Sequence, residues 1–556
     1  MTTASRAGRL RPGEEYVPKI VTVLREGYGR ASLRADALAG LTVAIVALPL
    51  SMAIAIASGV GPERGLYTAI VGGFLVSALG GSRHQIGGPA GAFIVLIAAC
   101  VADIGVSGLV LATFLSGFLL MAIGVLRLGG YIKFIPYPVV VGFTAGIAVI
   151  ILSSQVKELF GLTLPGPEPA ALLPKLAALW DARGSVSGAA VAIAFGTIAM
   201  IEGIKRLRPG WPSLLIAVAV ASIATAGLGL DVETIGTRFG ELPRLPPAPA
   251  LPTLSGAALA EAIPYAVSFA LLGAIESLLS AIVADGMTGA QHRSNAELVA
   301  QGVANAGSAL FGGICVTGTI ARTATNVRAG SRGPISGMLH ALFVLAFMVV
   351  AAPLAGNIPL AALAGLLAVV AWGMAEKEEF WALLRASKGD AMVLLATFLL
   401  VIFRDLTEGI VVGFALGGLV FIRRMSEAAR LEPAGEAVEE LSEATDPDVL
   451  VYHIRGAFFF GAAATVGSVL DRIAGRPRNF VVDLSEVPLM DSTGARSLGL
   501  LAQKMARKGG RLYLTAASPD VRRMLWAQGV REPKVRFLPD VAGALAEARG
   551  KATNQG

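Results

Sequence analysis

Apolar residues along this chain form long blocks that stop abruptly near residue 424, after which apolar and polar positions alternate in short runs. Blocks of about 20 apolar residues are long enough to cross a bilayer as helices. We predict spans at 37–57, 66–79, 89–101, 108–126, 138–156, 186–204 and 212–228, then at 262–284, 297–311, 319–327, 335–355, 360–374, 391–403 and 410–422. The Pro-rich stretch 242–252 separates two halves of seven spans each. An odd number of spans inverts the second half relative to the first.

The third element of each half is interrupted by small residues. In the first half, Gly87-Gly88-Pro89-Ala90-Gly91 precedes an apolar run, and in the second half a polar island covers residues 312–326. Each stretch predicts an extended piece followed by a half-length helix, the second starting near Thr319. Such helix starts leave N–H groups unpaired at the positive end of the helix dipole, and Arg322 adds a full charge. We expect an anion site in mid-membrane, with two ordinary Gly-rich loops as the alternative.

The segment after residue 424 has the pattern of a small α/β domain behind a linker. We predict strands at 449–454, 480–484, 511–515 and 535–538, with helices at 462–474, 493–508, 519–528 and 541–548. This alternation is typical of a small sheet covered by helices. Ser492 stands at a helix start, where a phosphate group is electrostatically favoured, so it is a candidate regulatory site. A plain capping turn made by Asp491 or Ser492 is the alternative.

The predicted organisation is residues 1–35 as a polar, basic N-terminal segment, 36–424 as the membrane domain with halves of about 36–230 and 260–424, 425–447 as a linker, and 448–550 as the α/β domain. Basic residues concentrate in loops on the side of the two termini: Arg127, Lys133, Lys205, Arg206, Arg208, Arg293, Arg328, Arg332, Lys377, Arg385, Lys388, Arg423 and Arg424. Positive loops favour the cytoplasmic face. We therefore expect a multi-pass inner (plasma) membrane protein with both termini in the cytoplasm.

Composition restricts the function classes. The chain is 54% hydrophobic and 15% charged, which excludes a soluble protein. Its net charge of +7 fits basic loops better than nucleic-acid binding. Cys100 and Cys315 both lie in apolar segments, so no disulfide framework or metal cluster is expected. No phosphate-cradling loop, nucleotide fingerprint or hydrolytic triad occurs, so we expect neither an enzyme nor ATP-driven transport, and no cofactor.

A second charged residue lies inside an apolar segment. Glu276 interrupts the predicted span 262–284, and Ser280 follows one turn later on the same helix face. Intramembrane acids commonly mark ion paths. Glu276 can therefore carry a proton, ligate sodium or pair with Arg322, and a structural carboxylate bonded to backbone is the alternative.

Several stretches together resemble the SulP family of sulfate permeases and related anion transporters, which includes prestin. They are Asp36 to Ala44 with Pro49, Gly65-Leu66-Tyr67, Gly87-Gly88-Pro89, Glu276-Ser277-Leu278-Leu279, Asn295, Gln301-Gly302, Arg322-Thr323 and Asp491-Ser492-Thr493-Gly494. The resemblance implies fourteen transmembrane segments in a seven-plus-seven inverted repeat with core and gate domains, a C-terminal STAS domain and a homodimer. It also implies that anion binds at Ala90, Gly91, Ala92, Thr319, Ile320, Ala321 and Arg322, and that the acid of the eighth segment is Glu276.

Two positions depart from the family pattern. Many relatives have Pro-Gln in the first segment, where this chain has Pro49-Leu50 and so lacks one polar group near the anion. Sodium-coupled bicarbonate relatives carry Asp where this chain has Glu276, and the longer carboxylate crowds a sodium site. The first departure leaves the identity of the transported anion undetermined, and the second favours the proton over sodium as the coupling ion.

We therefore expect a proton-coupled secondary active transporter of a small anion, sulfate or bicarbonate, that works by elevator-like alternating access. The alternatives are a C4-dicarboxylate/proton symporter, sodium-coupled bicarbonate uptake and an uncoupled anion channel. A voltage-driven motor, a nucleobase permease and a non-transporting sensor are more distant rivals. Expected partners are the anion, membrane lipid, a second copy of the chain and a cytoplasmic protein that binds the STAS domain.

Overall fold

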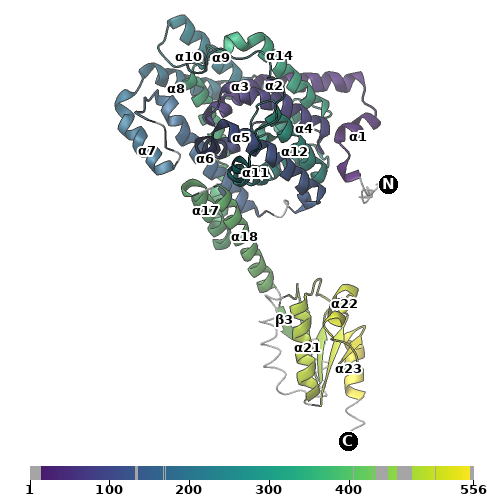
Figure 1. Cartoon of the computed structure of the whole chain (residues 1–556). Helices are drawn as coiled ribbons and strands as arrows, with labels where there is room; N and C mark the ends of the chain where they lie inside the picture. Colours follow the sequence, from purple (N-terminus) through teal and green to yellow (C-terminus); the bar gives the residue numbers. More distant parts are fainter. Residues whose placement is uncertain are drawn as a thin grey trace. The chain divides into compact units, whose positions relative to one another are not determined.

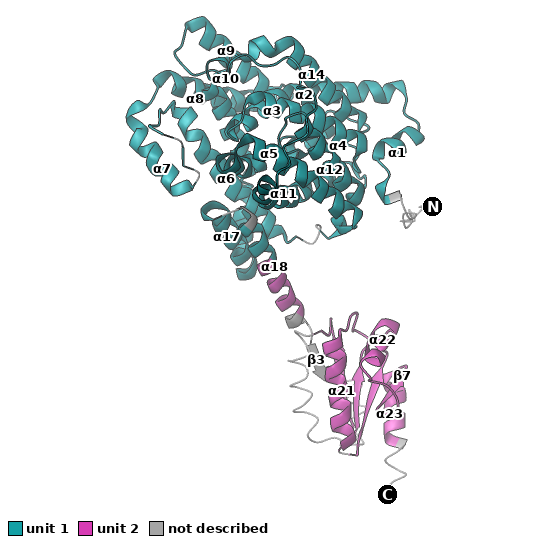
Figure 2. Ribbon diagram, viewed as in Figure 1, with its two compact units in different colours: residues 1–414 teal, residues 415–556 magenta. Residues whose placement is uncertain are grey.

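The computed structural model describes residues 14–131, 135–166, 168–169, 171–404, 406–428, 430–433, 449–459, 479–507 and 509–550. The chain divides into two compact units, residues 1–414 and 415–556 (Figure 2). The start of the N-terminal segment, most of the predicted linker and the predicted helix 462–474 lie outside the described residues.

The first unit is helical throughout most of its length (Figure 1). Its first half contains α1 (Lys19–Arg25), α2 (Arg30–Ala57), α3 (Pro62–Tyr67), a π-helical turn (Thr68–Gly72), α4 (Gly73–Leu79), α5 (Ile94–Val125), α6 (Tyr137–Phe160), α7 (Leu172–Asp181), α8 (Gly188–Leu207), α9 (Ser213–Leu228) and α10 (Ile235–Phe239). Its second half contains α11 (Gly256–Thr288), α12 (Ser294–Leu310), α13 (Ile320–Arg328), α14 (Ile335–Ala355), α15 (Leu360–Met374), α16 (Lys377–Ala386) and α17 (Lys388–Phe403). Helix α18 (Leu406–Ala428) crosses the boundary between the units.

Seven of the described helical stretches are long and apolar enough to cross a membrane, and α9 is apolar but shorter. The remaining predicted spans correspond to shorter pieces, such as α3 to α4, α12, α13 and α17. The prediction of a mostly α-helical membrane protein is confirmed, and the count of fourteen spans stays a prediction.

Helix packing separates two groups within the first unit. Helix α5 packs against α11 and α12, and α14 packs against α2. Helix α6 packs against α15 and α17, while α8 packs against α9 and α15. The first group holds the early segments of both halves and the second group holds the late ones. This grouping agrees with the division into core and gate domains that the family resemblance implies, and that division stays a prediction.

Two features of the helical unit differ from the prediction. The predicted spans 89–101 and 108–126 belong to one helix, α5, which is broken at Gly105, where φ is +72°. That value lies in the left-handed region, which glycine adopts without strain. The short helices α7, α10 and α16 were not expected, because they are too short or too polar to give a span signal.

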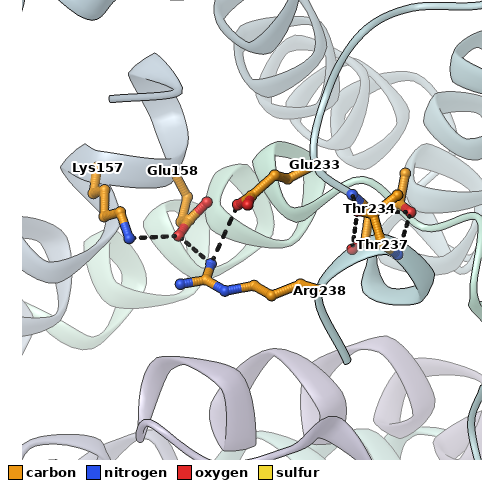
Figure 3. A network of polar contacts seen from close by, with 6 residues as sticks. All are labelled: Lys157, Glu158, Glu233, Thr234, Thr237 and Arg238. Carbon is orange, nitrogen blue, oxygen red and sulfur yellow. Dashed lines mark hydrogen bonds and ion pairs between the residues drawn. The ribbon is translucent and has the colours of Figure 1, made fainter. Parts of the chain in front are cut away.

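One end of the helical unit carries a polar network (Figure 3). The Nη1 atom of Arg238 lies 2.6 Å from Oε1 of Glu158 and 3.6 Å from Oε2 of Glu233. Lys157 lies 3.8 Å from the same Glu158 oxygen. Helix α10 begins with a capping box, in which the side chains of Thr234 and Thr237 each accept a hydrogen bond from the other residue's backbone N–H group. The network ties the α9–α11 connection to the end of α6.

Loops that were predicted to share the side of the termini gather around the N-terminal segment. Arg127 Nη2 lies 2.8 Å from Glu15, and Arg293 Nη1 donates to the Val17 carbonyl oxygen at 2.8 Å. The N–H of Arg332 donates to the carboxylate of Asp36 at the start of α2. These contacts place Arg127, Arg293 and Arg332 beside the N-terminal part of the chain. The side of the membrane that the basic loops and the termini face stays a prediction.

The second unit contains a five-stranded sheet in the order β3-β4-β5-β6-β7. Its strands are β3 (Arg430–Pro433), β4 (Val449–Arg455), β5 (Asn479–Asp483), β6 (Arg511–Thr515) and β7 (Val535–Leu538), and its described helices are α21 (Ser492–Arg507), α22 (Pro519–Ala527) and α23 (Val541–Gly550). Among the described strands of this sheet, only β3 runs antiparallel to its neighbour, and it lies within the segment predicted as linker.

Successive residues of the central strands point to opposite faces of this sheet. Phe480 and Val482 pack with α21 and α22, whereas Val481 packs with α23. The predicted α/β character of the segment is therefore confirmed, with helices on both faces of a mostly parallel sheet.

Candidate functional site

The centre of the candidate site is a two-stranded ladder between the two halves of the helical unit. Strand β1 (Gly87–Gly88) pairs antiparallel with β2 (Thr317–Gly318), with Gly87 opposite Gly318. A helical turn, η3 (Gly91–Phe93), leads from β1 into α5, and α13 follows β2. The predicted sequence of extended piece and helix is therefore confirmed in both halves. Because the strands are paired, both helix starts are fixed to the same ladder.

Small residues allow this ladder to form in a crowded interior. A Cβ atom on Gly87 would overlap the side chain of Val76, and one on Gly88 would overlap the Arg322 guanidinium. A Cβ atom on Gly318 would overlap the Gln85 side chain. At these positions glycine serves close approach rather than a special φ value.

Side chains replace the ladder hydrogen bonds that such short strands cannot make. The Asn305 amide of α12 accepts from Val316 N at 3.0 Å and donates to Val316 O at 2.8 Å. Thr323 Oγ1 of α13 accepts from the Ile86 N–H at 3.1 Å. Thr319 N donates to the Ile86 carbonyl oxygen at 3.0 Å. These bonds fix the start of α13 against β1.

Arg322 lies in the first turn of α13 and is 2% exposed. Its Nη2 atom donates to Ser51 Oγ of α2 at 3.2 Å. Its Nε and Nη1 atoms are buried and have no hydrogen-bond partner among the described residues, and no acidic side chain of the described chain neutralises the charge. A buried cation of this kind is costly unless an anion compensates it.

The outer surface of the helix start is accessible although Arg322 is buried. Ala321 is exposed and Ile320 is partly exposed, whereas Thr319 is 8% exposed. At the other helix start, Ala90 and Ala92 are buried and Gly91 is partly exposed. The space beside the Gly91 Cα faces Met374 Sδ at the end of α15, 3.4 Å from where a Cβ would lie. The first helix start therefore faces the group of helices around α6.

The two expected coupling residues occupy different places. Ser280 Oγ of α11 donates to Thr323 Oγ1 at 3.0 Å, so Ser280 supports the ladder. Glu276 is 7% exposed, one turn earlier on α11. Among the described residues, Glu276 forms no ion pair with Arg322. Of the roles that the sequence left open for Glu276, the structure therefore does not support pairing with Arg322.

Sequence reasoning missed several polar residues around Arg322. His340 of α14 is fully buried, and neither ring nitrogen has a partner among the described residues. Asn326 Nδ2 donates to the His84 carbonyl oxygen at 2.8 Å and to Ser336 Oγ at 2.9 Å. A lone histidine inside a predicted span was a usable signal, since ionisable residues are rare there. The partners of Asn326 depend on tertiary contacts that no local pattern encodes.

In the second unit, the candidate regulatory serine stands at the start of α21. Asp491 Oδ1 accepts from the Gly494 N–H at 2.8 Å and caps the helix. Ser492 is the first helical residue and is exposed. Its hydroxyl is therefore accessible for modification, while Asp491 performs the capping.

A helical bundle with several membrane-spanning stretches, two strand-and-helix units that meet at a buried arginine, and an appended α/β domain define a multi-pass membrane transporter. Comparison with known proteins agrees. The sequence model of the sulfate permease family matches residues 33–397, and that of the STAS domain matches residues 441–544. The chain belongs to the sulfate permease family, whose members are transporters and not enzymes.

Relatives and solved structures are similar over most of their lengths. The putative sulfate transporter YvdB of Bacillus subtilis is 38% identical over 507 residues, 91% of this chain and 95% of its own. The bicarbonate transporter BicA of Picosynechococcus is 30% identical over 523 residues, 89% of this chain and 90% of its own. The murine anion transporter Slc26a9 has the same fold, with a TM-score of 0.84 at 18% identity, over 99% of this chain and 97% of that structure.

Proposed function

We propose that this protein is a secondary active transporter of a small anion, sulfate or bicarbonate, coupled to protons and working by elevator-like alternating access. We place it in the inner membrane as a homodimer with both termini in the cytoplasm. The names of the similar proteins support the substrate class, since YvdB is described as a putative sulfate transporter and BicA as a bicarbonate transporter.

One observation carries the proposal: Arg322 is buried without a neutralising acid among the described residues. Its unpartnered Nε and Nη1 atoms are donors in a fixed planar fork, which suits the oxygens of an oxyanion. The starts of η3 and α13 add N–H groups and partial positive charge at the same ladder. An anion bound there satisfies donors that the protein leaves unpaired.

The coupling role falls to Glu276. A buried carboxylate without a cationic partner is costly, whereas the protonated carboxyl group is far less so. Loading a proton onto Glu276 therefore lowers the cost of moving this part of the protein across the membrane. Ser280 takes a supporting role in this scheme, because its hydroxyl already bonds Thr323.

Uptake of radiolabelled anions into proteoliposomes tests the site. We expect Arg322→Ala to abolish saturable uptake and Arg322→Lys to retain part of it, since Lys keeps the charge but not the fork. Arg328→Ala is the matched control, because Arg328 lies on the same helix but is exposed. This variant should transport normally. Saturable uptake by Arg322→Ala, or equal losses in both Ala variants, would contradict the proposal.

The same vesicles separate the alternative functions. Sulfate, bicarbonate and fumarate are offered with an imposed proton gradient, an imposed sodium gradient or neither. Fumarate accumulation driven by protons would indicate the dicarboxylate symporter, and bicarbonate accumulation driven by sodium would indicate the sodium-coupled transporter. Flux that follows voltage and ignores both gradients would indicate a channel.

A further inference from the structure

A second cationic feature lies away from Arg322, where the N-terminal helix meets two loops. A cavity of about 330 Å³ is lined by Lys19 of α1, by Arg83 and His84 between α4 and β1, and by residues 288–291 at the end of α11 and just after it. The three segments are far apart in the sequence. Basic side chains contribute to the lining from two of them, and none of the described lining residues is acidic.

The charge of Lys19 is only partly compensated by the described residues. Its ammonium group makes no ion pair with any of them. Burial, followed by the neighbouring charges of Arg293 and Arg83, lowers the pKa of Lys19, while Asp285 and Glu26 act in the opposite direction and only partly offset this effect. The nearby acids are engaged elsewhere. Glu26 binds Arg83 at 2.5 Å, and the Asp285 carboxylate accepts from the N–H of His292 at 2.8 Å. Arg83 is thus paired with Glu26, and an anion in the cavity would offset the remaining repulsion between Lys19 and Arg293.

Backbone and side-chain contacts hold these cations in place. Lys19 N donates to the Gly80 carbonyl oxygen at 2.9 Å, which docks α1 on the loop that carries Arg83. Arg293 Nη1 donates to Val17 O and Thr22 Oγ1, both of them neutral acceptors. The cavity is therefore formed before any ligand arrives, and binding requires little rearrangement.

We propose that this cavity binds a phosphate group, either of a phospholipid headgroup or of a free phosphate-bearing anion. Phosphate is compact and multiply charged, and ammonium and guanidinium groups form strong charge-assisted hydrogen bonds with it. Basic pockets between membrane helices are suited to anionic lipid headgroups. Leu24 of the same helix α1 does not line the cavity, but its apolar side chain is 54% exposed, which favours the lipid as the source of the phosphate group.

The experiment uses the full-length chain carrying Arg322→Ala, so that phosphate cannot act through the proposed transport site. Thermal unfolding is followed in detergent with inorganic phosphate against sodium chloride at equal ionic strength. A second arm compares nanodiscs of phosphatidylcholine with nanodiscs that also contain phosphatidylglycerol. The added variants are Lys19→Gln, Gln291→Glu and the control Lys388→Gln, which removes an exposed charge on α17.

We expect phosphate or phosphatidylglycerol to raise the melting temperature. Lys19→Gln should weaken the binding by about tenfold, as for the loss of one charge-assisted contact. Gln291→Glu adds a negative charge at an exposed lining residue and should therefore also weaken the binding. This variant tests the cavity even if Lys19→Gln fails to fold. Lys388→Gln should bind normally. A response to phosphate alone assigns the free anion, and a response to phosphatidylglycerol assigns the headgroup. No response to either, or equal binding by all variants, overturns the proposal.

Discussion

Replacing Gly88 by alanine perturbs Arg322 without touching its charge. A Cβ atom on Gly88 would lie closer to Arg322 Nη1 than the 3.0 Å that Cβ atoms keep from other heavy atoms, and 3.4 Å from Cζ. Carbon and nitrogen atoms in contact sit about 3.5–4.0 Å apart. The guanidinium must therefore move by about 1 Å or more, because Gly88 is fixed by its pairing with Thr317.

The size of the effect follows from the bonds that this movement breaks. The Arg322 Nη2–Ser51 Oγ bond is already 3.2 Å long, and a further shift of about 1 Å removes it. A hydrogen bond that involves a charged group contributes about 1.5–3 kcal/mol. With the anion-facing nitrogens displaced as well, we expect the KM for anion uptake to rise about 10- to 100-fold, in line with the cost of misplacing a binding group by about 1 Å.

The assay is initial-rate sulfate and bicarbonate uptake into proteoliposomes over a range of substrate concentrations. Gly196→Ala is the control, since a Cβ at Gly196 in α8 meets no atom within 4 Å. Hydrogen exchange in β1 and α13 checks that the ladder stays folded. An unchanged KM in a folded Gly88→Ala protein would refute the argument that the Arg322 position sets anion affinity.

Two further predictions concern acidic groups. Glu276→Gln keeps the shape of the side chain but cannot exchange a proton, so anion uptake should lose its response to an imposed proton gradient while anion-induced thermal stabilisation persists. In the second unit, burial opposes ionisation of Asp483, but hydrogen bonds from Ser485, Thr515 and His453 outweigh it and lower the Asp483 pKa below 3.8. Its stabilisation of the sheet is therefore complete above that pH and disappears on acidification through the lowered pKa. Asp483→Asn should cost about 1–3 kcal/mol at neutral pH, measured by hydrogen exchange in β5.

Local pattern was sufficient for most elements of the fold. Strands β6 and β7 have the predicted bounds, and α13 begins one residue after the predicted start at Thr319. Apolar length and small-residue interruptions encode these features directly. Helix α16 could not be found in this way, because its polar residues give no span signal. Strand β3 lies in a polar segment and exists through its pairing with β4, which is a long-range contact.

The candidate site was predictable in its centre and not in its surroundings. A lone Arg322 next to a helix start is visible in the sequence, because an intramembrane charge is costly wherever it lies. Its bond to Ser51 joins residues 271 positions apart, and the close approach to Gly88 depends on the β1–β2 ladder. No local pattern encodes such contacts. The missed His340 belongs to the same category as Arg322 and could have been included on the same grounds.

The separation of Arg322 from Glu276 has a mechanistic consequence under the proposed function. If the two formed an ion pair, the empty site would be neutral and could cross the membrane without substrate. Because no such pair exists among the described residues, each buried charge needs its own neutralising ion. The anion compensates Arg322 and the proton compensates Glu276, so movement with only one of them leaves an uncompensated charge in a low-dielectric environment. Coupling then arises from the cost of burying charge, with no direct contact between the two ions.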